Sequence, residues 1–145
     1  MTHSRGDTPS RVLTIMLRGI GGVSLLALPF VVAPYSWMNA IHMGLGMGEL
    51  PSEPVVGYLT RSTSAFYALL GGLFLLLSRN PRRFRPVLMY LGVAVILFGV
   101  VLFCVDWIEG LPMVWRVIEG PFCVALGTAI FLLSRRLEDD GNWHS

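Results

Sequence analysis

Residues 105–120 read VDWIEGLPMVWRVIEG and join two long apolar runs of the chain. The charged side chains in this stretch are Asp106, Glu109, Arg116 and Glu119. Gly110 and Pro112 are residue types that often bound helices, so we expect a tight turn at 109–112 between two antiparallel helices. The stretch therefore predicts a helical hairpin whose connected ends carry charges next to apolar sequence.

The apolar runs on either side of this turn have two counterparts earlier in the chain. Hydrophobic residues make up 54% of the 145 residues and charged residues only 14%, which is more apolar surface than a domain of this size could bury in water. Each run is long enough to cross a bilayer as a helix, which takes about 20 mostly apolar residues. The expected spanning helices cover approximately residues 12–34, 55–78, 87–108 and 112–134. The predicted fold class is an all-α membrane protein, a four-helix transmembrane bundle at 12–134 between tails at 1–11 and 135–145.

The distribution of arginine predicts the orientation in the membrane. All eleven basic residues are arginine, and eight of them flank the apolar runs on one side: Arg5, Arg11, Arg79, Arg82, Arg83, Arg85, Arg135 and Arg136. The connections 35–54 and 109–111 contain none. Because basic residues stay on the cytoplasmic side, both termini and the loop at 79–86 are expected in the cytoplasm. This asymmetry accounts for the net charge of +2 without a nucleic-acid partner.

The long connection at 35–54 predicts a short helix. Ser36 could cap a helix that starts at Trp37. One apolar face of that helix would hold Trp37, Met38, Ile41 and Leu45. We expect it to be an interfacial helix, lying in the first outer loop with its aromatic residues as anchors. The candidate interfacial residues of the chain are Trp37, His42, Trp107 and Trp115.

The same connection contains His42 and several methionines, which are ligand types that also suit copper. Glycines at 44, 46 and 48 would fray a ligand helix, so His42 is interpreted as a solvated or hydrogen-bonded interface residue. Cys104 and Cys123 lie in separate runs without metal-ligand spacing, and we expect both to be buried apolar thiols. No metal and no cofactor is predicted.

Small residues at regular spacing predict which helix faces pack together. In the second expected helix, a four-residue spacing gives Thr60, Ser64, Ala68 and Gly72. In the third, a seven-residue spacing gives Gly92, Gly99 and Asp106. In the fourth, a four-residue spacing gives Glu119, Cys123 and Gly127. Helices in lipid approach closely where side chains are small, so these stripes are expected to face the bundle interior.

Four of the charged side chains inside the expected spans form the candidate polar cluster or ligand pocket: Arg61, Asp106, Arg116 and Glu119. Arg18, near the cytoplasmic end of the first span, is instead expected to snorkel to the headgroups. Arg61 and Glu119 are expected at similar depth in helices of the same direction, and the turn at 109–112 brings Asp106 near Arg116. We therefore predict two ion pairs, Arg61–Glu119 and Asp106–Arg116, because an unpaired charge in a bilayer is costly. Three interpretations stay open: a structural network that fixes helix register, the lining of a pocket open to the outer face, or simple solvation at the interface, chiefly for Glu109.

Three stretches carry a resemblance to a known family: RSTSAFYALLGGLFLLLSRNPRRFRPVLMYLG at 61–92, DWIEGLP at 106–112 and VIEGPFCVALGTAIFLL at 117–133. They resemble the DoxX-like proteins, small four-helix bacterial membrane proteins that include members of unknown function. The shared elements are a charge before a Gly-Gly segment, an Arg-Pro loop, a D-x-x-x-G-x-P turn and a Glu early in the fourth helix. The residues at these recurrent positions are Arg61, Asp106, Gly110, Pro112 and Glu119.

This resemblance covers roughly residues 12–134 and implies a location in the bacterial inner (cytoplasmic) membrane. The family name derives from a membrane subunit associated with a quinone-linked oxidoreductase, and distant relatives with a comparable bundle bind or isomerise sterol-like ligands. The chain has no recognisable haem ligand pair, iron–sulfur spacing or flavin motif, which argues against a redox role of its own.

Three functions are compatible with these features. The leading hypothesis is a non-catalytic module that binds a membrane lipid, a quinone or another small apolar molecule, or that serves as a helper subunit of a membrane complex. The second is a membrane enzyme, oxidoreductase-associated or isomerase-like, that uses the charged cluster for proton transfer. The third is a small transporter subunit, which at 145 residues would need a protein partner or homo-oligomer.

Overall fold

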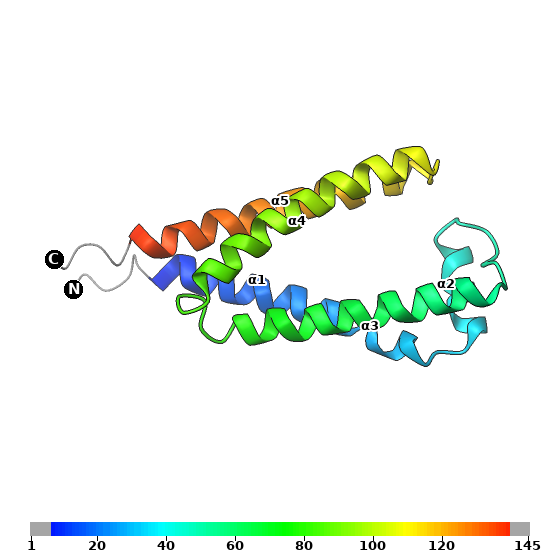
Figure 1. The fold of residues 1–145 in the computed structure, drawn as a ribbon, viewed down its shortest axis with the longest axis horizontal. Helices are drawn as coiled ribbons and strands as arrows, with labels where there is room; N and C mark the ends of the chain where they lie inside the picture. Colours follow the sequence, from blue (N-terminus) through cyan, green and yellow to red (C-terminus); the bar gives the residue numbers. More distant parts are fainter. Residues whose placement is uncertain (1–6, 140–145) are drawn as a thin grey trace. The chain divides into compact units, whose positions relative to one another are not determined.

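The computed structural model describes residues 7–139, which are helical with no strand among them. The helices are α1 (Asp7–Leu25), the 3-10 helix η1 (Leu28–Val31), α2 (Tyr35–Gly44), α3 (Pro54–Leu77), α4 (Arg85–Ile108) and α5 (Met113–Asp139) (Figure 1). Four segments are long and apolar enough to cross a membrane: Thr8–Val31, Pro54–Leu77, Arg85–Ile108 and Met113–Leu137. The expectation of an all-helical chain with four such segments is confirmed. Residues 1–6 and 140–145 of the expected tails lie outside the described residues.

The first apolar run is not one continuous helix. Helix α1 ends at Leu25, and a turn leads into η1, which has a proline in its first turn. A proline at position 29 has no N–H for the carbonyl of Leu25, and its ring clashes with that carbonyl in an α-helix. Pro29 therefore explains why α-helical structure stops at Leu25 although the apolar sequence continues.

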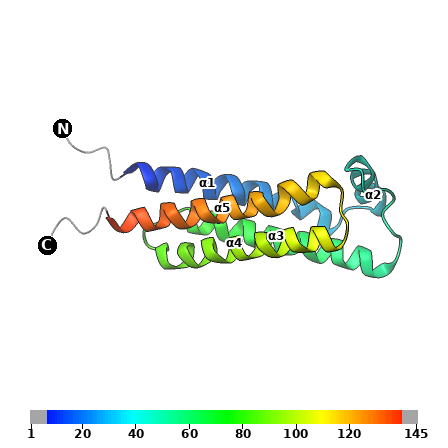
Figure 2. The same cartoon turned by 90° about the horizontal axis from the view of Figure 1, so that it is seen from above.

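The chain divides into two compact units, residues 17–76 and residues 1–16 with 77–145. In the second of these, α4 and α5 lie side by side and run in opposite directions, as two views show (Figures 1 and 2). A Cβ added at Gly99 would come within 2.7 Å of the carbonyl oxygen of Gly120, and one at Gly127 within 2.6 Å of that of Gly92. These distances leave no room for a side chain, so the two backbones are in direct contact.

This glycine contact recurs every seven residues along both helices. Gly92 and Gly99 on α4 face Gly127 and Gly120 on α5, and all four are buried. At the next position of the same spacing, Arg85 donates a hydrogen bond from Nε to the carbonyl oxygen of Ser134, at 3.1 Å. At the opposite end the spacing reaches Asp106, which is also buried. The predicted Gly92, Gly99 and Asp106 stripe is thus the face of α4 that is buried.

The turn between α4 and α5 stops one helix and starts the next within four residues. Gly110 has a φ of +67°, the left-handed conformation that glycine adopts without steric cost. The N–H of Leu111 donates to the carbonyl of Asp106, at 3.1 Å, which is the 6→1 bond of a Schellman motif. Pro112 then opens α5, and its carbonyl accepts from the N–H of Trp115, at 2.9 Å. The D-x-x-x-G-x-P pattern is therefore a helix stop followed by a helix start.

In the unit formed by residues 17–76, α1 and α3 meet through a second glycine contact. A Cβ at Gly21 would lie 2.8 Å from the carbonyl oxygen of Gly71, and one at Gly71 would lie 2.8 Å from that of Gly21. Ser64 and Ala68 of the predicted stripe are buried, whereas Gly72 is exposed with nothing near it. The stripe was therefore wrong at its last member, because a helical turn of 3.6 residues brings Gly71 onto that face.

The 35–54 connection does contain a short helix, but it is not capped as expected. Helix α2 begins at Tyr35 after Pro34, and no side chain caps it, so the prediction for Ser36 is wrong. The following loop folds back on the helix: the amide N–H of Leu50 donates to Oδ1 of Asn39, at 2.7 Å, and the Tyr35 hydroxyl donates to the Leu50 carbonyl. These two hydrogen bonds hold the loop against α2, although the loop itself forms no helix or strand.

Candidate functional site

Arg61 lies in α3 and is half-buried. Its Nη1 donates to the carbonyl oxygen of Val31, at 3.0 Å, and its Nη2 donates to that of Ala33, at 3.1 Å. Both carbonyls belong to the segment after the break in the first apolar run, where Pro34 has no N–H to offer Val31. Arg61 therefore satisfies backbone acceptors that the broken helix leaves open, which matters most in a membrane, where water is scarce.

Asp106 lies near the end of α4 and is only 2% exposed. Among residues 7–139 its Oδ2 has no hydrogen-bond partner. A buried carboxyl oxygen without a donor is unfavourable, because desolvation is not compensated. Asp106 thus places a carboxyl group in the α4–α5 interface, and this burial lowers the free energy of unfolding.

Arg116, one turn into α5, is directed at the preceding turn. Its Nε donates to the carbonyl oxygen of Leu111, and its Cζ lies 5.1 Å from the ring centroid of Trp107, within the range of a cation–π interaction. No ion pair joins Arg116 to Asp106 among residues 7–139, and the predicted pair is wrong. The guanidinium contacts the Leu111 carbonyl of the turn and the Trp107 ring at the end of α4 instead of the Asp106 carboxylate.

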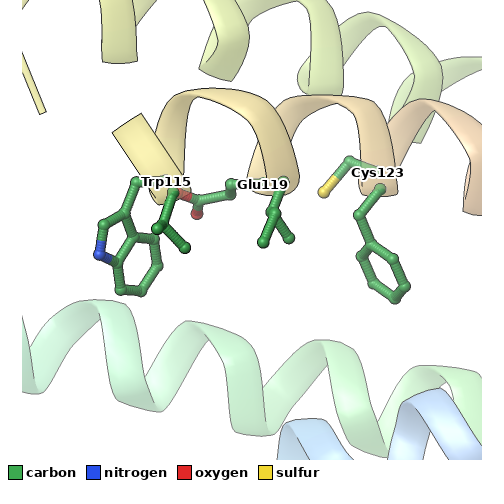
Figure 3. A pocket seen from close by; sticks show the side chains of 6 residues that line it. Trp115, Glu119 and Cys123 are labelled. Carbon is green, nitrogen blue, oxygen red and sulfur yellow. The ribbon is translucent and has the colours of Figure 1, made fainter. Parts of the chain in front are cut away.

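Glu119 is half-buried and lines an open hollow of about 390 Å³ on one face of α5. The hollow is lined by Val114, Trp115, Ile118, Glu119, Phe122 and Cys123. Figure 3 shows Trp115, Glu119 and Cys123 on the same side of the helix, as their four-residue spacing requires. Glu119 is the only charged residue in an otherwise apolar and aromatic lining.

Two of the four candidate residues lie on the packed helices α4 and α5 of one unit. These are Asp106 and Glu119, whose carboxyl groups repel one another when both are ionised. Arg61 belongs to the unit at residues 17–76, and Glu119 belongs to the other unit. The predicted Arg61–Glu119 ion pair therefore stays a prediction. What the structure brings together is therefore a pair of carboxyl groups in the α4–α5 hairpin.

The interfacial candidates differ in their surroundings. Trp37 is 62% exposed, and Nδ1 of His42 lies 2.9 Å from the Gly48 carbonyl oxygen, so His42 is hydrogen-bonded to the loop after α2. Trp107 packs edge-on against Phe103, with 6.3 Å between ring centroids, and also contacts Arg116. Trp115 lines the hollow and so belongs to the candidate site as well.

The sequence interpretation placed Cys123 on one face with Glu119 but missed the rest of the apolar lining of the hollow. Ile118 and Phe122 lie within one helical turn of Glu119, and a four-residue step back from that carboxyl reaches Trp115. Cys104 was expected to be buried but is exposed on α4, because it lies off the face that carries the glycines. Cys123 is partly exposed in the hollow.

Comparison of the chain with protein-family models, with curated proteins and with solved structures finds no match.

Proposed function

We propose that the chain is a multi-pass protein of the bacterial inner membrane, with α1, α3, α4 and α5 as its spanning helices. Large apolar side chains that are exposed on these helices support this, because their contact with water is unfavourable. Leu69 is 69% exposed and Tyr90 is 72% exposed. The one-sided arginines place both termini and the 78–84 connection in the cytoplasm. In this orientation α2 and the α4–α5 turn lie at the outer face, with Trp37 and Trp107 in the interface.

The function that we propose is the binding of a small apolar molecule in the α5 hollow, by a non-catalytic module or helper subunit. One observation carries this proposal: an apolar and aromatic lining around one carboxyl group, which is the composition typical of small-molecule sites. The volume of about 390 Å³ is within the range of such sites. Asp106 on the packed helix α4 is a second sign, because it is buried with an Oδ2 that accepts no hydrogen bond among residues 7–139, and such groups lower stability and are common at functional sites.

The resemblance to DoxX-like proteins gives the same proposal a family context. Its recurrent positions include Asp106, Gly110 and Glu119, and the turn at 109–112 gives Gly110 and Pro112 a structural role. Arg61, Asp106 and Glu119 are the members of the pattern that the helix turn does not explain, and Arg61 is bonded to the carbonyls of Val31 and Ala33. We propose that the two carboxyl residues serve the ligand site.

Catalysis by the four-residue cluster has less support. Proton-transfer chemistry would gain from an arginine beside Asp106 to stabilise developing negative charge. Arg116 instead directs its guanidinium to Leu111 and Trp107. Arg61 donates two bonds to backbone carbonyls within its own unit. A binding role for the carboxyl pair needs neither arginine.

Fluorescence of Trp115 tests the binding function. A variant that keeps Trp115 but has phenylalanine at positions 37, 107 and 143 is titrated with an uncharged alkyl alcohol that carries bromine on its chain, because bromine quenches a nearby indole. A matched variant that keeps only Trp37 reports partition into the surrounding lipid or detergent. We expect saturable quenching of Trp115 at concentrations that leave Trp37 nearly unquenched. Equal, non-saturating quenching in both variants would overturn the proposal.

A further inference from the structure

Glu119 has no cationic partner among the described residues of its own unit, 7–16 and 77–139, although it lies in an apolar hollow. The nearest arginine along α5 is Arg116, one turn away, and its guanidinium is held by the Leu111 carbonyl and the Trp107 ring. A carboxylate surrounded by apolar side chains favours a positive partner strongly, because the low dielectric screens the attraction only weakly. The hollow therefore favours a positively charged ligand, which its apolar lining alone would not do.

Asp106 adds to this preference from the neighbouring helix α4. It is buried at 2% exposure, and its Oδ2 accepts no hydrogen bond among residues 7–139. Its carboxyl belongs to the same unit as that of Glu119, and two carboxylates in one unit repel unless a cation or a proton compensates them. An incoming positive charge would be stabilised by both, at Glu119 directly and at Asp106 over a longer distance.

The remaining lining residues suit the other parts of such a ligand. Trp115 lies one turn from Glu119 on the same face, where its ring can receive a cation (Figure 3). Ile118 and Phe122 continue the apolar lining and are 58% and 62% exposed, which leaves area for an alkyl chain to cover. Cationic head and apolar tail thus each have a matching surface on one helix.

We propose that the occupant of the α5 hollow is a single-chain amphiphile with a protonated amine as its head group, which contacts Glu119 and Trp115 while its chain lies along Ile118 and Phe122. This inference rests on the proposed binding function and adds the chemical class of the ligand. An ammonium group donates a hydrogen bond to Glu119 with charge on both partners, whereas a hydroxyl donates from a neutral group and a carboxylate is repelled. The site is therefore expected to rank amine above alcohol above carboxylate for one chain length.

The test compares dodecylamine, dodecanol and dodecanoate for binding to the purified full chain in phosphatidylcholine nanodiscs at neutral pH. The wild type is measured beside Glu119→Gln, with Glu109→Gln as the matched control, since Glu109 is exposed in the turn and does not line the hollow. We expect Glu119→Gln to weaken dodecylamine binding about tenfold, the size of one lost charge-assisted hydrogen bond, and to leave dodecanol binding unchanged. Glu109→Gln should change neither. Repeating the dodecylamine titration in discs that contain phosphatidylethanolamine shows whether a lipid amine occupies the site, and we expect at most a twofold loss.

Three results would overturn the inference in separable ways. Equal affinity for dodecylamine and dodecanol, unchanged by Glu119→Gln, would leave the binding function standing but remove the amine. No saturable binding of any of the three would remove the proposed function itself. An Arg61→Gln variant that binds dodecylamine about tenfold more tightly would show that Arg61 normally neutralises Glu119, so that the cation of the site belongs to the protein.

Discussion

Gly99 of α4 and Gly120 of α5 lie against each other so closely that a side chain on either would meet the carbonyl oxygen of the other, at 2.7 and 2.8 Å. One heptad away, Gly92 and Gly127 repeat the relationship. In the membrane location that we propose, apolar side chains gain little from association in lipid, so close packing of backbones is a main source of attraction between the helices. These glycines therefore hold the hairpin that carries both carboxyl groups of the candidate site.

A methyl group at Gly99 should weaken the hairpin. Gly99→Ala is expected to lower the free energy of unfolding by about 1–3 kcal/mol, because two backbones must move apart. The control is Gly72→Ala, which meets nothing within 4 Å and should be neutral or stabilising, since alanine favours helix by about 1 kcal/mol over glycine. Thermal unfolding in detergent compares the two. Equal melting temperatures would mean that the glycine contact does not hold the helices.

Arg61 should stabilise the break in the first apolar run. Arg61→Gln removes two donors from the carbonyls of Val31 and Ala33 and is expected to cost about 1–3 kcal/mol for each acceptor left unpaired. Arg61→Lys should restore little, because a single ammonium does not present the planar fork of a guanidinium. Arg18→Gln on the exposed side of α1 is the control. Full rescue by lysine would show that charge rather than geometry matters at this position.

Asp106 should cost stability rather than provide it. Replacing it with asparagine keeps the shape but removes a buried carboxyl group whose Oδ2 accepts no hydrogen bond among residues 7–139, so the free energy of unfolding is expected to rise by about 1 kcal/mol or more. The same variant should bind dodecylamine more weakly and dodecanol as before, since only the charge is lost. Unfolding by denaturant and the nanodisc titration measure the two effects. A loss of stability in Asp106→Asn would indicate a stabilising partner for the carboxylate and contradict this account.

The orientation in the membrane is a separate prediction. A cysteine introduced at Gly44 should react with a membrane-impermeant thiol reagent added outside spheroplasts, and one at Arg82 should react only after lysis. The expectation follows from eight arginines on one side of the spans and none in the two opposite connections. The reverse labelling pattern would move the α5 hollow to the cytoplasmic half.

The helices could be predicted from the sequence because segment length, apolar content and turn residues are local properties of the chain. The four segments, the turn at Gly110 and Pro112 and the buried spacing of Gly92, Gly99 and Asp106 all follow from such local signals. The break after Leu25 was missed because hydropathy continues through Pro29, although a proline inside an apolar run is itself a signal. Gly71 rather than Gly72 faces α1 because a strict four-residue spacing drifts from a helical turn of 3.6 residues.

The candidate site was harder to predict because each arginine can donate hydrogen bonds to several different acceptors. Arginine has five donors, and backbone carbonyls near Pro34 and Gly110 compete with carboxylates for them. Arg61 and Arg116 both bind such carbonyls, and no pattern of charged residues would reveal that choice. The hollow around Glu119 depends on apolar neighbours one turn away, which charge spacing alone does not select.

The central claim, that a ligand occupies the α5 hollow, can be tested most directly by the two cysteines of the chain. Cys123 lines the hollow and Cys104 is exposed on α4 outside it, so one alkylation experiment contains its own control. The protein is treated with N-ethylmaleimide with and without saturating dodecylamine, and peptide mass spectrometry follows each thiol. The account predicts that dodecylamine slows alkylation of Cys123 several-fold while Cys104 reacts at an unchanged rate. Unchanged labelling of Cys123 at saturation, or equal slowing of both thiols, would contradict it.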